Sequence, residues 1–251
     1  ALFKIIVLTT HSYETGRLAS SLPTCQRLSM ADSLDVSIVI PTFNEANRLG
    51  ATLERIAAFS KSYPSKVDVI ISDDGSVDGT CSLAGSFEAD FSIRVLRLPH
   101  RGPGNAIAQG VLSTDADWIV LSDADGPVPF DTIGPMIQHA QTHEVDVLSG
   151  RRVGPGAVIQ HPQPLYRRCM GVAWRAFVRR GVGLPFVDPQ CGFKLFRGSV
   201  SRTIFAETRS TSFGIHVEAM LLARAFGYTF EEFPVVWGDR DGSKIRPIRD
   251  A

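Results

Sequence analysis

The sequence is poor in cysteine, and its cysteines show no pattern. Only four occur in 251 residues, and they are widely scattered: Cys25, Cys81, Cys169 and Cys191. This number and spacing argue against a small secreted domain held by disulfides, and the chain has no CxxC pair of the kind that binds metals or performs redox chemistry. We therefore expect reduced, structural thiols.

Net charge and long apolar runs are also lacking. Lysine plus arginine and aspartate plus glutamate number 26 each, so no overall field favours nucleic acid, and we expect no nucleic-acid partner. No run reaches the roughly 18 to 20 apolar residues that cross a bilayer, and the stretch from Leu2 to Leu8 is short and interrupted by Lys4. The expected location is cytoplasmic and peripheral at a membrane surface. Because the chain begins with Ala1, an anchor outside the given sequence is left open.

What the chain does contain is an alternation of short β-branched runs and segments of helical period. Residues 1–34 show no such periodicity, and we treat them as an extension of unknown role, followed by a single domain over 35–251. The pattern predicts helices over about 45–59, 103–111 and 133–143 and strands over 36–40, 67–72, 93–98, 118–122 and 145–149. This is an α/β fold with a mostly parallel sheet flanked by helices.

Polar clusters follow three of the predicted strands. Open parallel sheets bind ligands outside the carboxyl ends of their strands, so these clusters mark a candidate site. A single cluster of this kind also fits a turn with helix-capping carboxylates, but three on one edge favour a ligand site. The three pairs are Asn44 and Glu45, Asp73 and Asp74, and Asp123 and Asp125.

The segment IVLSDADG over 119–126 carries the clearest chemistry. Asp123 and Asp125 are separated by one residue directly after an apolar strand, so both can reach one hard cation such as Mg²⁺ or Mn²⁺. Such a cation shares its ligands with substrate phosphates and acts as a Lewis acid for a departing diphosphate. A DxD pair alone also arises by chance in loops, so its neighbours decide its meaning.

Those neighbours resemble a known family. The segments VSIVIPTFNE over 36–45, DDGSVDGT over 73–80 and DADG over 123–126 resemble, in order and spacing, family 2 glycosyltransferases of the GT-A fold. The segments HRGPGNAIAQGV over 100–111, DPQCGFKLF over 188–196 and WGDRDGSKIR over 237–246 resemble the dolichyl-phosphate and polyprenyl-phosphate hexosyltransferase branch. DADG and GFKLF look closer to the glucosyl than to the mannosyl group. The resemblance covers roughly 36–246 and implies a Rossmann-like GT-A sheet.

The resemblance also implies roles for individual residues on the donor side. It assigns Asp123 and Asp125 to the metal and the diphosphate, but Pro127 stands where related mannosyltransferases often have a glutamine ligand. In the segment RGPG, backbone amides at a helix N-terminus would approach a phosphate, unless the segment is a simple loop-to-helix turn. The residues implied to hold the nucleotide sugar are Pro41, Phe43, Glu45, Asp73 or Asp74, Arg101, Gly102, Gly104, Arg240, Ser243 and Lys244, the last three as a phosphate clamp or an ordinary polar turn.

Arginines suggest where an anionic acceptor binds. Arg151 and Arg152 end a strand, and Arg168 begins an arginine stripe on a predicted helix from about Leu165. Guanidinium groups bind phosphate in bidentate fashion, although a solvated helix face gives the same pattern. Asp188, Gln190 and Glu218 are expected to line the sugar or acceptor pocket. His216 stands where the family frequently has aspartate, so a catalytic and a structural role are equally open there.

The expected reaction is transfer of a hexose from a nucleotide diphosphate sugar to dolichyl or polyprenyl phosphate. UDP-glucose is the favoured donor and GDP-mannose the next. A phosphate monoester is already largely ionised at neutral pH, so it needs no general base, and Arg151, Lys244 and the cation would balance its charge. Inversion at the anomeric carbon is implied by the resemblance.

Three other readings stay open. A family 2 transferase acting on a sugar hydroxyl would need a base, for which Asp188, Glu218 and His216 are candidates. A catalytically silent nucleotide-binding module would bind nucleotide without transferring sugar. A nucleotidyltransferase fits less well, because PTFNE stands after Ile40 in place of a glycine-rich basic loop.

Overall fold

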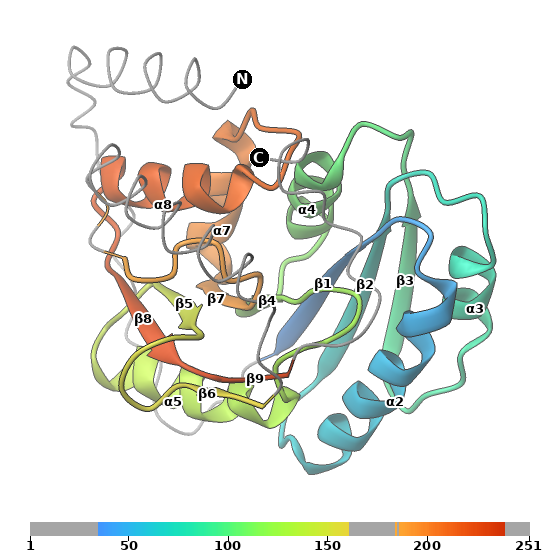
Figure 1. Ribbon diagram of the computed structural model, residues 1–251, viewed down its shortest axis with the longest axis horizontal. Coiled ribbons are helices and arrows are strands. Elements are labelled where there is room, and N and C mark those ends of the chain that lie inside the picture. The colour runs from blue at the N-terminus through green and yellow to red at the C-terminus, as the bar shows by residue number, and fades with distance from the viewer. Residues whose placement is uncertain (1–34, 161–183, 185, 239–251) are drawn as a thin grey trace.

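The computed structural model describes residues 35–160, 184 and 186–238, and within them one mixed, mostly parallel sheet dominates (Figure 1). Its seven strands lie in the order β3-β2-β1-β4-β7-β5-β8. All neighbouring strands run parallel except β7, which is antiparallel to both β4 and β5. The strands are β1 (Val36–Thr42), β2 (Val67–Asp73), β3 (Ser92–Arg97), β4 (Trp118–Leu121), β5 (Val147–Arg151), β7 (Lys194–Arg197) and β8 (Phe230–Pro234).

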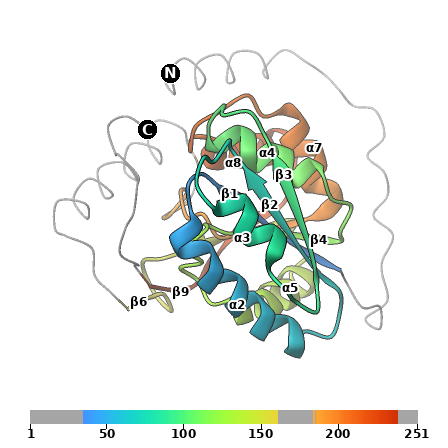
Figure 2. The ribbon, with the colours of Figure 1, turned by 90° about the vertical axis from the view of Figure 1, so that its right-hand side faces the viewer.

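Helices cover both faces of this sheet, as Figure 2 shows from the side. One face packs on α2 (Ala46–Ser62), α3 (Thr80–Ser86) and α5 (Ile133–Thr142), which follows the short 3₁₀ turn η1 (Phe130–Thr132). The other face packs on α4 (Pro103–Leu112), α7 (Gly198–Glu207) and α8 (Ile215–Ala225). The predicted α/β architecture is confirmed.

Apolar periodicity explains this layering. In β1, Ile38 and Ile40 point into the α2 layer, whereas Val39 points into the α4 layer, and all three are fully buried. A strand buried on both faces reads as a continuous apolar run, and this is the pattern of 36–40. In α2, Leu49 and Leu53 are spaced by one helical turn, and both are fully buried.

The reversal of β7 decides what lies at the functional edge. Lys194 at the start of β7 pairs with Leu121 at the end of β4. The loop that precedes β7 therefore reaches the same edge of the sheet as the segment DADG that follows β4. The sequence predicts the GFKLF strand but not its direction, and this direction brings Asp188 to Gly192 beside the acidic pair.

Smaller elements complete the described part of the chain. The strands β6 (Val158–Ile159) and β9 (Val236–Trp237) form a separate two-stranded parallel ribbon that the sequence analysis did not anticipate. Among the helices of the described residues, none is long and apolar enough to cross a membrane.

Candidate active site at the carboxyl edge of the sheet

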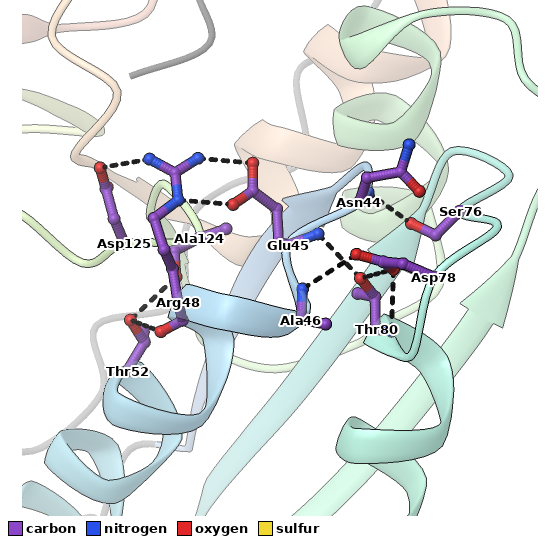
Figure 3. A network of polar contacts seen from close by, with 10 residues as sticks. All are labelled: Asn44, Glu45, Ala46, Arg48, Thr52, Ser76, Asp78, Thr80, Ala124 and Asp125. Carbon is purple, nitrogen blue, oxygen red and sulfur yellow. Dashed lines mark hydrogen bonds and ion pairs between the residues drawn. The ribbon is translucent and has the colours of Figure 1, made fainter. Parts of the chain in front are cut away.

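The loops after β1 and β2 are tied together by their own polar groups. Asn44 adopts a left-handed backbone with φ of 56°, and its amide donates to the Ser76 hydroxyl at 2.8 Å. Its side-chain oxygen accepts from the Val77 amide at 3.0 Å. The amide of Glu45 donates to the Thr80 hydroxyl at 2.8 Å (Figure 3). These contacts hold the start of α2 against the start of α3.

Asp73 and Asp74 are both buried and already hydrogen-bonded within the protein. Asp73 accepts from the hydroxyls of Thr42 and Ser76. Asp74 accepts from the backbone amides of Arg101 and Gly102 at 2.8 to 3.1 Å. Their assignment to the base or ribose stays a prediction, and in this structure a nucleoside would have to compete with these partners.

The glycines of RGPG serve a different purpose from the one expected. The amide of Gly104 donates to the Thr211 carbonyl at 2.9 Å, and a Cβ there would lie 2.2 Å from the Ser210 carbonyl oxygen. Gly102 has φ of 107°, and a Cβ there would lie 2.3 Å from the Thr211 carbonyl oxygen. Close packing against the chain at 210–212 therefore requires both glycines. The amides of Arg101, Gly102 and Gly104 point to protein oxygens, so the expectation that they face a phosphate is not met.

An exposed aromatic surface lies beside these loops. The ring of Phe43 stacks on His100 with 4.4 Å between centroids and an interplanar angle of 17°. Phe43 is 40% exposed, and Pro41 behind it is partly exposed. The Nδ1 atom of His100 lies 2.7 Å from an oxygen of Asp74. A flat apolar face next to polar groups is suited to a nucleoside ring.

The DADG segment is held in place by α2. The Thr52 hydroxyl donates to the Ala124 carbonyl at 2.8 Å. Arg55 donates to the carbonyls of Asp125 and Gly126 at 2.7 Å each. These contacts hold the segment through its backbone oxygens and not through the carboxylates of Asp123 and Asp125.

Asp123 lies in an environment that disfavours its charge. Burial, and then repulsion from Asp125, raise the pKa of the Asp123 carboxyl to about 6. Gly192 lies against this carboxylate, and a Cβ on Gly192 would lie 2.5 Å from one Asp123 oxygen and 2.6 Å from the other. A nearby cation would relieve the repulsion, which is the condition expected of a metal-binding pair.

Arg48 is a residue of this site that the sequence analysis missed. Its guanidinium lies between Glu45 and Asp125 (Figure 3). It donates to both oxygens of Glu45, at 2.6 and 2.7 Å, and to one oxygen of Asp125 at 3.3 Å. The carboxylate of Glu45, expected at the nucleoside, is thus engaged with Arg48. The signal was available, because Arg48 stands one helical turn after Glu45.

Arg152 and Asp188 form a buried ion pair. Arg152 donates to Asp188 through its backbone amide and two guanidinium nitrogens, at 2.7 to 3.0 Å. Burial alone would raise the pKa of Asp188, but the hydrogen bonds from Arg152 hold it below its usual value. Each residue thus has a charged partner within the protein, and their assignment to an acceptor stays a prediction.

Arg151 points to a different partner. Its guanidinium donates to the carbonyls of Val153 at 2.7 Å and Pro155 at 2.8 Å. These acceptors are neutral, so the positive charge of Arg151 is not cancelled by them. Its assignment to an acceptor phosphate stays a prediction.

Lys194 is the second functional candidate that the sequence analysis did not identify. It is fully buried and donates to the Ser149 hydroxyl and to the carbonyls of Pro189 and Cys191, at 2.7 to 3.1 Å. Burial lowers the pKa of Lys194 to about 8. A lysine within a predicted strand is ordinarily expected to face solvent. Only the tertiary structure shows that Lys194 is buried and holds the loop before β7.

Glu218 and His216 occupy the first turn of α8 and are both buried. Glu218 accepts from the backbone amides of Arg209 and Ser210, at 3.0 and 2.8 Å. It therefore holds a loop, and its role in an acceptor pocket stays a prediction. Burial, Lys194 and Arg152 lower the pKa of His216 to about 3, so its ring is neutral, and its Nδ1 has no hydrogen-bond partner among the described residues.

Several predicted residues are not placed by this geometry. Gln190 is partly buried in the loop before β7, and its acceptor role stays a prediction. Arg168, Arg240, Ser243 and Lys244 lie outside the described residues. Within the described ranges, no group of three or more histidine, cysteine or acidic side chains is arranged to hold a metal. The pair Asp123 and Asp125 still fits a cation that takes its other ligands from water and phosphate.

Comparison with known proteins agrees with this geometry. A dolichyl-phosphate beta-glucosyltransferase of Dictyostelium discoideum is 28% identical over 86% of this chain and 70% of its own length. The enzyme of that name from Saccharomyces cerevisiae is 28% identical over 96% of this chain and 77% of its own length.

Among solved structures, glucosyl-3-phosphoglycerate synthase from Mycobacterium tuberculosis, crystallised with Mn²⁺ and UDP-glucose, matches with a TM-score of 0.58 and 18% identity, over 86% of this chain and 73% of that one. This likeness shows the shared GT-A fold. The model of glycosyl transferase family 2 matches residues 37–225, which is more than half of the chain. The mostly parallel sheet and the edge that gathers Asp123 and Asp125 fit this match, and the chain belongs to glycosyl transferase family 2.

Proposed function

We propose that this glycosyltransferase moves glucose from UDP-glucose to dolichyl phosphate or another polyprenyl phosphate, with inversion at the anomeric carbon. The observation that carries the proposal is the position of Asp123 and Asp125 directly after β4 at the carboxyl edge of the sheet, in a chain similar to dolichyl-phosphate beta-glucosyltransferases. GDP-mannose is the second candidate donor. The lipid acceptor implies work at a membrane surface, with the protein peripheral to it on the cytoplasmic side.

The protein's own residues divide the work. Phe43 and His100 offer the face for the nucleoside, and the tied loops after β1 and β2 fix its position. Asp123 and Asp125 would hold Mg²⁺ or Mn²⁺, which neutralises charge on the departing diphosphate. The amides of the RGPG segment are not free, so the diphosphate needs cationic side chains, for which Arg240, Ser243 and Lys244 are proposed.

The acceptor explains why no general base is needed. A phosphate monoester is already ionised near pH 7, so the task is to hold two anions close together. Arg152 is paired with Asp188, whereas the contacts that the structure describes for the Arg151 guanidinium are to neutral carbonyls. We assign Arg151, together with Arg168, to the acceptor phosphate.

The donor and the metal are tested by one set of incubations. The protein is mixed with Mn²⁺, a polyprenyl phosphate and either UDP-glucose or GDP-mannose, beside Asp125→Ala. We expect an acid-labile lipid-phosphate glucose from UDP-glucose and a rate lower by at least about a hundredfold in the variant. Transfer from GDP-mannose alone would overturn the donor assignment, and full activity of Asp125→Ala would overturn the role of the metal.

Transfer to a sugar hydroxyl is the second candidate function. It needs a base, and of the three candidates Asp188 and Glu218 are already engaged in hydrogen bonds that hold the fold. His216 has a neutral ring and an Nδ1 atom without a hydrogen-bond partner among the described residues, but its pKa of about 3 makes it a weak base near neutral pH. Glucosylation of free sugars that is abolished by His216→Ala would favour this function over the first.

A further inference from the structure

A guanidinium occupies one member of the acidic pair. Arg48 lies between Glu45 and Asp125 (Figure 3). It also interacts electrostatically with Asp123. A divalent cation bound by Asp123 and Asp125 would therefore arrive where a positive charge already stands. The geometry of the two contacts of Arg48 indicates which of them would break on binding of the ion.

The two contacts of Arg48 differ in strength. The contact with Glu45 is a fork of two hydrogen bonds at 2.6 and 2.7 Å, which is short for a charge-assisted pair. The contact with Asp125 is a single hydrogen bond at 3.3 Å, longer than the usual range for such a bond. Glu45 is also nearly buried, so its fork is shielded from water. Breaking the contact of Arg48 with Asp125 therefore costs less free energy than breaking its contact with Glu45.

The positive charge of Arg48 affects how strongly this site attracts a divalent ion. The three carboxylates of Glu45, Asp123 and Asp125 would attract a divalent ion, and Arg48 opposes that attraction both by its charge and by its hydrogen bond to Asp125. Once the ion is bound, the fork to Glu45 would keep Arg48 close by. Arg48 thus places a positive charge beside the same carboxylates that would bind the ion.

We propose that Arg48 is a positioning residue that holds Asp125 in the ion-free protein and thereby weakens binding of the divalent ion until the nucleotide supplies further ligands. This inference rests on the proposed metal site. The start of α2 would then couple metal binding to donor binding. Arg48 lowers the affinity for the ion, and the phosphate oxygens of the nucleotide raise it again.

The test is direct binding of Mn²⁺, followed by the paramagnetic resonance signal of the free ion, without nucleotide and without turnover. We expect Arg48→Gln to bind Mn²⁺ at least about tenfold more tightly than the wild type, because one positive charge and its hydrogen bond to Asp125 are removed. Arg48→Lys, which keeps the charge, is expected within about threefold of the wild type. UDP should tighten Mn²⁺ binding more in the wild type than in Arg48→Gln.

Arg55→Gln is the matched control. Arg55 lies on the same helix and bonds to the backbone of the same loop, but not to the Asp125 carboxylate. Arg55→Gln also removes a positive charge beside this loop, so a general charge effect or a loosened loop would change Mn²⁺ affinity equally in both variants, whereas the proposal predicts clearly less tightening in Arg55→Gln than in Arg48→Gln. Adding Asp125→Ala to Arg48→Gln should abolish the gain.

The outcomes separate the two levels of the argument. Unchanged or weaker Mn²⁺ binding by a folded Arg48→Gln, in a wild type that does bind the ion, would overturn the role of Arg48 alone. The same holds if Arg48→Lys binds as tightly as Arg48→Gln. Absence of Mn²⁺ binding by every variant, even with UDP, would overturn the metal site and the role of Arg48 together.

Discussion

At the scale of single residues, most charges at the carboxyl edge hold the protein's own loops. Arg152 binds Asp188, Glu218 binds two backbone amides, and Lys194 binds two carbonyls and a hydroxyl. Asp123 differs, because burial and Asp125 raise the pKa of its carboxyl to about 6. A group held in an unfavourable state by the fold is a candidate for function.

This difference predicts an effect on stability. The pKa of Asp123 in the folded protein lies above its ordinary value of 3.8, so its ionised form destabilises the fold above about pH 6. Since Asp123 is partly exposed, we discount the effect and expect Asp123→Asn to raise the free energy of unfolding by about 1–2 kcal/mol at pH 8. The gain should shrink as the pH falls from 6 towards 4. Thermal or denaturant unfolding without metal measures it.

Asp115→Asn is the matched control for this prediction. Asp115 is almost fully exposed, and its distance to Arg202 is 3.9 Å, so the change should stay within about 0.5 kcal/mol. Destabilisation by Asp123→Asn at pH 8 would contradict the account of the Asp123 environment.

The sequence could predict which residues lie at the site, but not which groups they bond. The spacing of Asp123 and Asp125 after an apolar strand fixed their position at the sheet edge, as the structure shows. The partners of Asp74, Asp188 and Glu218 were not predictable, because they come from segments 8 to 36 residues away in sequence. Arg48 and Lys194 were missed because a charged residue in a helix or strand ordinarily faces solvent.

At the scale of elements, the direction of β7 is the decisive feature. It brings the loop from Asp188 to Gly192 against the DADG segment, and Lys194 holds that loop through the carbonyls of Pro189 and Cys191. The strands and helices that were predicted from apolar periodicity are present with boundaries shifted by a few residues, whereas α3, α7 and β8 were not predicted. The antiparallel pairing of β7 is a long-range property that local periodicity does not encode.

This packing predicts a selective effect of Gly192→Ala. The new Cβ would meet the Asp123 carboxylate, whose side chain is able to turn away, so the fold should lose little stability. The turned carboxylate would leave the proposed metal site, and we expect Mn²⁺ affinity and sugar transfer to fall by at least about tenfold. Binding and rate assays beside a thermal melt measure the two effects separately.

Gly134→Ala provides the comparison, since a Cβ at Gly134 in α5 meets nothing within 4 Å. It should leave transfer unchanged and change stability little, because the helix preference of alanine is offset by its position before Pro135. Equal transfer rates in Gly192→Ala and Gly134→Ala would show that Asp123 does not depend on the loop before β7.

At the scale of the whole molecule, the fold and the family were predictable because the motifs fall in order along the chain at the ends of the strands. The family match over residues 37–225 and the seven-stranded sheet confirm both. The acceptor is the less constrained half of the reaction. Of the residues proposed for the acceptor, Arg151 bonds carbonyls of its own loop and Arg152 is paired with Asp188, so the proposed identity of the acceptor rests on chemistry.

The central claim is that an already ionised phosphate, and not a hydroxyl, attacks the sugar. The most direct test is a competition in which UDP-glucose and Mn²⁺ are supplied with equal amounts of a polyprenyl phosphate and the polyprenol of the same chain length. We expect glucose on the phosphate alone, with inverted configuration and a rate that falls below about pH 6 as the acceptor gains its second proton. Glucosylation of the polyprenol at a comparable rate, or of neither lipid, would contradict the account.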